Sequence, residues 1–146
     1  MTIKVENIHT VLFADDDANI RLIVQMSLEG LTNWKVILAA TGKEAVQAAH
    51  EHKPDLLLLD VMMPDMDGTE VITAINQNST SKLPVIFITA KVQRQEISRY
   101  KSLGALGLIM KPFNPMKLAQ EVKALIEESS AGGAAPLKVG QDAKSK

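Results

Sequence analysis

Five polar residues of this chain, each of a type that can do chemistry, follow directly after or close behind short apolar runs. They are Asp15, Asp16, Asp60, Thr89 and Lys111. Mg²⁺ prefers one or two carboxylates together with waters and phosphate oxygens, and a hydroxyl or an ammonium group donates strong hydrogen bonds to a phosphoryl group. The set therefore fits a magnesium ion and a phosphoryl group better than it fits a sugar, a peptide or a nucleobase.

The apolar runs predict why these side chains meet. They span Val11–Ala14, Leu56–Leu59, Val85–Ile88 and Leu106–Met110, with helical stretches between them. Such runs are typical of buried parallel strands, and open α/β sheets bind ligands outside the carboxyl ends of their strands. We therefore expect the acids, the hydroxyl and the ammonium at one edge of a sheet.

Five strand-then-helix units are predicted along the chain. The expected strands are Ile8–Ala14, Lys35–Ala39, Leu56–Asp60, Val85–Thr89 and Leu106–Met110. The expected helices cover Ile20 to Leu31, a segment from Thr41 through Ala49, Thr69 to Asn76, a segment near Gln93–Ser102 and one near Pro115–Glu128. Thr41 and Glu44 form a capping-box pattern. Strict alternation indicates an α/β fold with a doubly wound parallel sheet of five strands and helices on both faces.

Length and composition set the outer limits. A chain of 146 residues with 46% hydrophobic content suits one compact domain, which we place at residues 1–128. From Ser129 the composition turns to Ser, Ala, Gly and Lys, so we expect residues 129–146 to be a flexible tail, either a leftover linker or an interaction tail.

The remaining compositional features argue against several classes of protein. The net charge is −1 and Lys and Arg are not clustered, which does not favour direct binding of nucleic acid. With no cysteine, disulfides and thiolate metal sites are excluded. The apolar runs are shorter than a membrane helix needs, and no signal peptide is visible. We expect a cytoplasmic protein with no membrane contact.

Taken one at a time, these residues also have plain structural explanations. Acids are favoured in the first turn of a helix, so capping explains Asp15, Asp16 and Asp17 as well as a metal site does. Asp17 suits the cap best, which leaves the other two as metal candidates. Asp60 alone is an ordinary turn acid, and Thr89 alone is a β-branched residue at a strand end.

Position strengthens the chemical interpretation. Asp60 follows four leucines, so its backbone is anchored in the core and its carboxylate emerges at the sheet edge, where it is the best nucleophile of the chain for forming an aspartyl phosphate. Lys111 follows an apolar strand, where an unpaired ammonium is costly, so it needs Asp60 or a phosphate as partner. The Thr89 hydroxyl can donate to a phosphoryl oxygen and carry a signal onward.

Four motifs together carry a family resemblance. They are Ala14–Asp17, Leu59–Gly68 (LDVMMPDMDG), Ile88–Ala90 (ITA) and Lys111–Phe113 (KPF). In this order and spacing they resemble the response-regulator receiver domain of two-component signalling, over about residues 8–128, in the manner of stand-alone chemotaxis receivers. The resemblance implies a flavodoxin-like strand order of 2-1-3-4-5.

The same resemblance implies specific roles. Asp60 is the phosphoacceptor, supplied by a sensor histidine kinase or a phosphotransfer protein, and Thr89 and Lys111 contact the phosphoryl group. The implied Mg²⁺ ligands are Asp15, Asp16, Asp60 and the backbone carbonyl of Met62. The bond between Lys111 and Pro112 is expected to be cis. The protein would catalyse only its own phosphorylation and dephosphorylation and would otherwise not be an enzyme.

The chain departs from the family pattern at one position. Many receivers have an aromatic residue on the fifth strand three positions before the lysine, and here that residue is Leu108, with Tyr100 as an aromatic on the preceding helix. Met62 and Lys91 occupy positions that the resemblance links to phosphate lifetime. Each also has a structural explanation, since a flexible Met62 side chain fills a gap in the loop and Lys91 is a solvated surface charge.

The sequence shows no output module, so the output is expected in an unknown downstream protein or in sequence beyond this chain. The face we expect to change partner binding on phosphorylation comprises the helix near Gln93–Ser102, the fifth strand and the last helix.

Two other functions compete with this interpretation. A phosphatase of the haloacid dehalogenase kind would use Asp15 and Asp17 as its Asp-x-Asp motif, but its further acidic pair and cap insertion are not visible. A degenerate receiver that acts only through phosphate-independent binding is disfavoured because the whole set of site residues is present.

Overall fold

The computed structural model describes residues 3–77, 82–91, 94–131 and 138–139. Its parallel strands are β1 (Thr10–Ala14), β2 (Lys35–Ala39), β3 (Leu56–Leu59), β4 (Val85–Thr89), β5 (Ala105–Met110) and the short β6 (Lys138–Val139). They lie in the order β2-β1-β3-β4-β5-β6. The predicted five-stranded core in the order 2-1-3-4-5 is therefore confirmed, with β6 as an addition at its edge.

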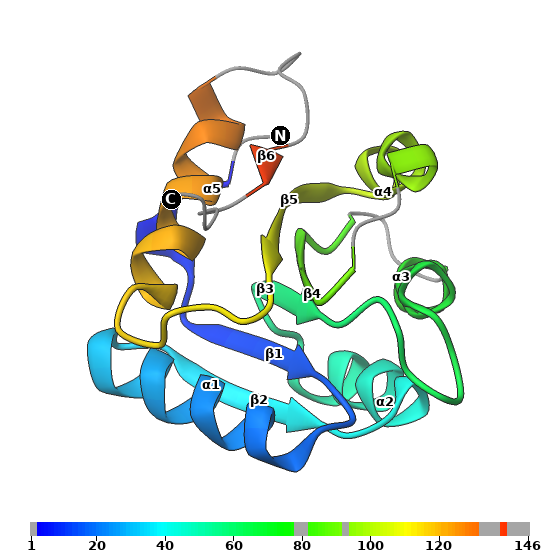
Figure 1. Cartoon of the computed structure of the whole chain (residues 1–146), viewed down its shortest axis with the longest axis horizontal. Helices are drawn as coiled ribbons and strands as arrows, with labels where there is room; N and C mark the ends of the chain where they lie inside the picture. The colour runs from blue at the N-terminus through cyan, green and yellow to red at the C-terminus, as the bar shows by residue number, and fades with distance from the viewer. Residues whose placement is uncertain (1–2, 78–81, 92–93, 132–137, 140–146) are drawn as a thin grey trace.

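Helices cover both faces of this sheet (Figure 1). One face carries α1 (Ala18–Leu31) and α5 (Leu118–Ala131), and the other carries α2 (Gly42–His52), α3 (Gly68–Asn76) and α4 (Ile97–Ser102). Short 3₁₀ turns lie at Val5–Asn7 and Arg94–Glu96. The doubly wound α/β class predicted from the alternating pattern is confirmed.

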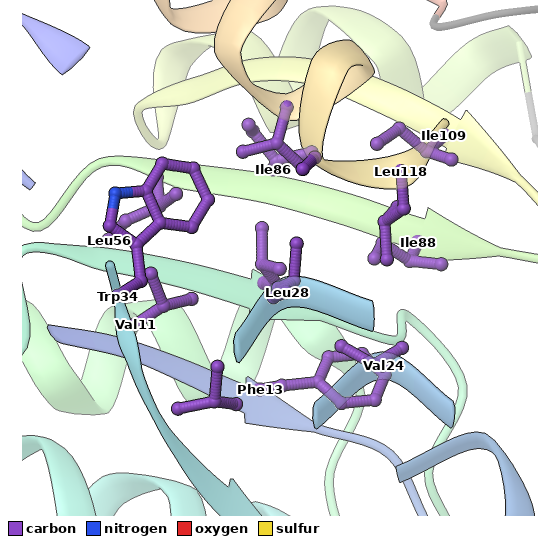
Figure 2. Close-up of a cluster of buried hydrophobic side chains, with 14 of the residues drawn as sticks. Val11, Phe13, Val24, Leu28, Trp34, Leu56, Ile86, Ile88, Ile109 and Leu118 are labelled. Atoms are coloured by element: carbon purple, nitrogen blue, oxygen red, sulfur yellow. The ribbon is translucent and has the colours of Figure 1, made fainter. Parts of the chain in front are cut away.

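The strands are apolar throughout because each of their faces packs against helices. Side chains alternate along a strand, so Leu56 and Leu58 join the cluster beneath α1 and α5, whereas Leu57 and Leu59 join the cluster beneath α2, α3 and α4. Figure 2 shows the first of these clusters, where Phe13 of β1 and Val24 and Leu28 of α1 gather with Trp34 and with residues of β3, β4 and β5. This packing anchors the strand ends that carry the polar residues.

Trp34 lies at the end of the sheet away from those polar residues. It directly precedes β2, whose first residue pairs with Thr10, the first residue of β1. Its ring is buried and lies 5.8 Å from the ammonium of Lys123 on α5.

The ends of α5 differ from the prediction. The helix begins at Leu118 rather than near Pro115, because the Asn114 side chain and carbonyl accept from the backbone N–H groups of Met116 and Lys117 and form a turn first. It continues beyond residue 128 to Ala131, where the Ser129 hydroxyl donates back to the Ile126 carbonyl.

The predicted flexible tail over residues 129–146 therefore overlaps the last turn of α5, and Lys138–Val139 pair with Gly107 and Leu108 of β5. The rest of that prediction, at residues 132–137 and 140–146, lies outside the described residues.

Two helix starts also differ in detail. At α2 the Thr41 hydroxyl accepts from Glu44 N–H as predicted, but the Glu44 carboxylate accepts from Ala40 N–H, one residue earlier than a capping box requires. A complete capping box instead opens α3, between Asp67 and Glu70. The fourth helix is shorter than predicted, since Arg94–Glu96 form a 3₁₀ turn before α4 begins at Ile97.

We predict that the Leu58→Ala substitution lowers the free energy of unfolding by about 3 kcal/mol. Its side chain is fully buried, and truncation of a buried leucine removes transfer free energy and leaves a cavity. Denaturation with urea measures the effect. Leu22→Ala is the control, because Leu22 is 54% exposed and its truncation should change stability by no more than about 0.5 kcal/mol. Equal losses in the two variants would contradict the assignment of the core.

Candidate functional site

The edge formed by the carboxyl ends of β1, β3 and β5 brings three predicted site residues together. The backbone N–H groups of Asp15, Asp60 and Lys111 each donate to the last carbonyl of a neighbouring strand over 2.9–3.1 Å. The sheet ladder therefore continues one residue past each apolar run. This fixes the backbone from which each polar side chain projects.

The ammonium group of Lys111 lies between two buried carboxylates. Its Nζ donates to Asp15 Oδ2 over 2.7 Å and to Asp60 Oδ2 over 2.9 Å. The side chains of the two acids are 0% and 9% exposed, and that of the lysine is 17% exposed. Burial by itself would lower the pKa of Lys111, but the hydrogen bonds and negative charges of Asp15 and Asp60 outweigh it and raise this pKa above its ordinary value.

The second oxygen of each buried acid is held by the backbone. Asp17 N–H donates to Asp15 Oδ1 over 2.9 Å, and Met62 N–H donates to Asp60 Oδ1 over 3.0 Å. Arg21, the fourth residue of α1, donates from Nη1 to the carbonyl of Asp15 over 2.8 Å. Both carboxylates are thus oriented before any ligand binds.

Asp16 completes an acidic cluster that suits a metal ion. Carboxylate oxygens of Asp15, Asp16 and Asp60 lie within 4.8 Å of one another, and Asp16 is exposed while the other two are buried. Lys111 donates to Asp15 and Asp60, and its ammonium carries a single positive charge against three carboxyl groups. A hard divalent cation that keeps several waters fits this partly open set of oxygens, so the residues present fit Mg²⁺.

Asp17 has the capping role predicted for it. Its Oδ1 accepts from the backbone N–H groups of Asn19 and Ile20, over 2.8 and 3.2 Å, at the start of α1. This satisfies two donors that otherwise have no partner within the helix. Among the three consecutive acids, it is the one that serves the helix.

Thr89 lies at the end of β4 and directs its hydroxyl into its own turn. The Oγ1 atom donates to the Lys91 carbonyl and accepts from Lys91 N–H, both over 3.3 Å, and the side chain is almost fully buried. Its backbone carbonyl accepts from Lys111 N–H over 2.9 Å, which joins the two strand ends.

A cleft of about 500 Å³ adjoins the cluster between the β3–α3 loop and α4. Its walls include Asp16, Met62, Lys91, Arg99 and Tyr100. The Tyr100 ring lies against Phe87 of β4 with centroids 4.6 Å apart, and Leu108 of β5 is fully buried in the same cluster. Met62 and Lys91 are exposed and border the cleft, as predicted for positions flanking the site.

Two residues near the site were not singled out from the sequence. Arg21 holds the Asp15 backbone, and Asp65 accepts from two backbone N–H groups at the start of α2. Neither contact has a local sequence signal, because each depends on how separate elements pack. The capping box of Asp67 and Glu70 does have such a signal in its Asp-x-x-Glu spacing. The cis bond expected between Lys111 and Pro112 is present.

Comparison with known proteins agrees with this geometry. The family model described as "Response regulator receiver domain" matches residues 11–123. The chain belongs to the response-regulator receiver family. Receivers of this family are regulatory domains of two-component systems, and the strand order and the acidic cluster described above are those of such a domain.

Curated relatives are transcriptional regulators longer than this chain. It is 36% identical over 119 residues to the alkaline phosphatase synthesis transcriptional regulatory protein PhoP of Bacillus subtilis, covering 82% of this chain and 49% of that protein. It is 32% identical over 133 residues to the phosphate regulon transcriptional regulatory protein PhoB of Pseudomonas aeruginosa, covering 90% and 58%. The receiver thus spans about half the length of the curated relatives it matches.

Solved structures of receivers match over nearly their whole length. The chemotaxis response regulator CheY4 of Vibrio cholerae has a TM-score of 0.73 at 31% identity, covering 82% of this chain and 99% of that one. A CheY-like receiver domain protein from Methanospirillum hungatei has a TM-score of 0.74 at 27% identity, covering 86% and 98%. Among the described residues of our receiver, no helix is both long and apolar enough to cross a membrane.

We predict that the receiver loses stability as the pH rises above about 10, and that part of this loss depends on Lys111. A raised pKa in the folded state means that the contribution of this lysine is complete below the unfolded value of about 10.4 and is lost as the pH rises through the folded pKa. Burial also raises the pKa of Tyr100, which adds a loss of the same sign. Urea denaturation between pH 8 and about 11.5 measures the slope.

In Lys111→Met the free energy of unfolding should fall less steeply with rising pH. Tyr100→Phe should reduce the slope by a separate amount and leave the contribution of Lys111 in place. Lys91→Met is the matched control, since its side chain is exposed. An alkaline slope in Lys111→Met as steep as that of the wild type would contradict the ion pairs at the centre of the site.

Proposed function

We propose that this receiver is a phosphoacceptor switch in which Asp60 accepts a phosphoryl group from a phosphohistidine donor. The observation that carries the proposal is the placement of Lys111 Nζ between Asp60 and Asp15, beside a third carboxylate. An oxygen of the Asp60 carboxylate attacks the phosphorus, an O–P bond forms, and the P–N bond to the donor imidazole breaks. The imidazole leaves with the electron pair and takes up a proton.

The residues around Asp60 suit this transfer. Asp15, Asp16, Asp60 and the backbone carbonyl of Met62 would hold Mg²⁺, which would supply charge neutralisation between the two negative reactants. Lys111 exchanges one carboxylate contact for a phosphoryl oxygen, which keeps its ammonium paired. The Met62 N–H orients the acceptor carboxylate through Oδ1.

The Thr89 hydroxyl is proposed to bind the incoming phosphoryl group. To do so it gives up two long hydrogen bonds of 3.3 Å with the Lys91 backbone, in the segment that leads toward α4. That helix has six residues, of which Tyr100 is the buried one. We propose that phosphorylation alters the face formed by α4, β5 and α5 and thereby the binding of a downstream protein, with no direct contact to nucleic acid.

We predict that Mg²⁺ and a small acyl phosphate add one acid-stable, base-labile phosphoryl group to the wild-type receiver, and that Asp60→Asn abolishes it. Intact-mass analysis measures the label, and amide chemical shifts in the same sample should change in α4 and β5. Asp55→Asn is the matched control, because Asp55 accepts from His9 and Thr10 N–H at the opposite end of the sheet. Labelling that survives Asp60→Asn would refute the proposal.

The same experiment tests the alternative function. A phosphatase of the haloacid dehalogenase kind would turn over many external phosphomonoesters rapidly. One stable phosphoryl group per chain with no such turnover supports the switch. Trp34 fluorescence is a poor reporter for this purpose, since the tryptophan lies at the amino ends of the strands.

The donor protein is proposed to dock on an apolar patch of α1. Leu22, Ile23 and Met26 are 54%, 39% and 66% exposed and share one face of the helix. Met116, which is 72% exposed, lies in the loop before α5. This loop is joined to α1 by a hydrogen bond from the Ser27 hydroxyl to the Pro115 carbonyl. Large apolar side chains grouped beside a reactive site are typical of a protein-binding surface.

We predict that Met26→Ala slows phosphoryl transfer from a kinase about tenfold, since an interface anchor contributes on the order of 1.4 kcal/mol or more. Labelling by the small acyl phosphate should be unchanged, because that donor needs no docking surface. The probe is whichever autophosphorylated sensor kinase labels the wild type fastest. Leu31→Ala, at the far end of α1 and 47% exposed, is the control. Equal slowing with both donors would refute docking on this patch.

A further inference from the structure

The loop between β3 and α3 is tied together at its base. Gly68 N–H donates to the Val61 carbonyl over 2.8 Å, Met62 pairs with Asp67 in an antiparallel bridge, and Met62 N–H donates to Asp60 Oδ1. The loop therefore leaves the acceptor aspartate and returns beside it. Residues 63–66 form the tip of this loop, beyond the bridged pair.

The tip is also held by α2, through Asp65. Its Oδ1 accepts from Gly42 N–H over 2.9 Å and its Oδ2 accepts from Lys43 N–H over 3.0 Å. These N–H groups open an eleven-residue helix and have no partner within it, and a carboxylate is favoured at this positive end. The bond from Gly42 N–H lowers the pKa of Asp65, with slight desolvation opposing it and the bond from Lys43 N–H adding to it.

A second, steric feature allows the same two segments to approach closely. A Cβ atom on Gly42 would lie 2.7 Å from Cβ and 3.0 Å from Cγ of Met66, at the loop tip. Because Met66 Cβ is attached to the loop backbone, a side chain at position 42 would push the tip away. The approach of loop and helix therefore depends on the carboxylate of Asp65 and on the absence of a side chain at Gly42.

We propose that Asp65 is a positioning residue that clamps the β3–α3 loop on α2 and so fixes the Met62 backbone carbonyl as a ligand for Mg²⁺. This inference rests on the proposed function, since it assumes that the acidic cluster holds the ion. Side chains that orient metal ligands govern affinity without touching the metal. The Met62 N–H is held by Asp60, but the Met62 carbonyl belongs to the planar peptide that leads into the tip. Release of the clamp lets this peptide turn, so the site binds Mg²⁺ more weakly but remains the same once saturated.

The test compares Mg²⁺ binding by Asp65→Ala, Gly42→Ala and the control Asp55→Ala in the full chain. Asp55 also accepts from two backbone N–H groups, His9 and Thr10, but at the amino end of the sheet. Titration calorimetry with MgCl₂ should show a dissociation constant about three- to tenfold higher in both clamp variants, below the change expected for loss of a residue that contacts a ligand directly. The Asp55 variant should match the wild type.

The concentration dependence of phosphorylation gives a second measurement. In both clamp variants the Mg²⁺ concentration for half-maximal labelling by the small acyl phosphate should rise by the same factor, and the rate at saturating Mg²⁺ should equal the wild-type rate. A role in stability alone would not move the half-saturation point. Gly42→Ala displaces the loop tip but leaves the charge of Asp65 in place. Weaker Mg²⁺ binding in this variant therefore cannot come from loss of the attraction between Asp65 and the cation.

Three results would overturn the clamp. Mg²⁺ affinity unchanged in Asp65→Ala, while wild type is labelled on Asp60, would do so. Weakening in Asp65→Ala with none in folded Gly42→Ala would show that the acid acts through its charge. Equal weakening in Asp55→Ala would show a general loss of stability. A wild type that takes no label refutes the proposed function instead, which keeps the two failures distinct.

Discussion

The ammonium of Lys111 between Asp15 and Asp60 is the interaction on which the rest of this structure depends. Two carboxylates about 4 Å apart repel by about 4 kcal/mol at an effective dielectric constant near 20. Burial of both acids is tolerable because one cation reaches each of them within 3 Å. The three residues follow three different strands, so the register of β1, β3 and β5 must be correct for the ammonium to meet both acids.

The site is nevertheless electrostatically incomplete. Three carboxylates share one lysine as their direct partner, at an edge whose backbone is fixed by the sheet ladder. The apolar side chains of β1, β3 and β4, packed on both faces, hold that edge in place against the repulsion. A divalent cation fits this edge, and in the proposed function a cation bound there prepares it for a phosphoryl group, which brings negative charge of its own.

Features that follow from local pattern were predictable from the sequence, and features that follow from packing were not. The apolar runs predicted the sheet and its order of elements, because buried parallel strands leave such runs. The acids at the strand ends and the cap at Asp17 followed from position alone. The contacts of Asp65 with Gly42 and Lys43 join segments 22 and 23 residues apart, so no local signal reveals them. The two residues of β6 are too few to show a strand pattern.

The departure at Leu108 bears on how a phosphorylated site communicates. Leu108 is fully buried and pairs with Phe87, whose ring also packs against Tyr100. Strand β5 therefore contributes no aromatic side chain that turns in or out. In the proposed switch, the contacts exchanged on phosphorylation are the two 3.3 Å bonds between Thr89 and the Lys91 backbone. Bonds of that length are weak, and a hydroxyl bound to a phosphoryl oxygen is stronger. On this proposal, the free energy that shifts the equilibrium between the two arrangements is no larger than the difference between the two sets of bonds.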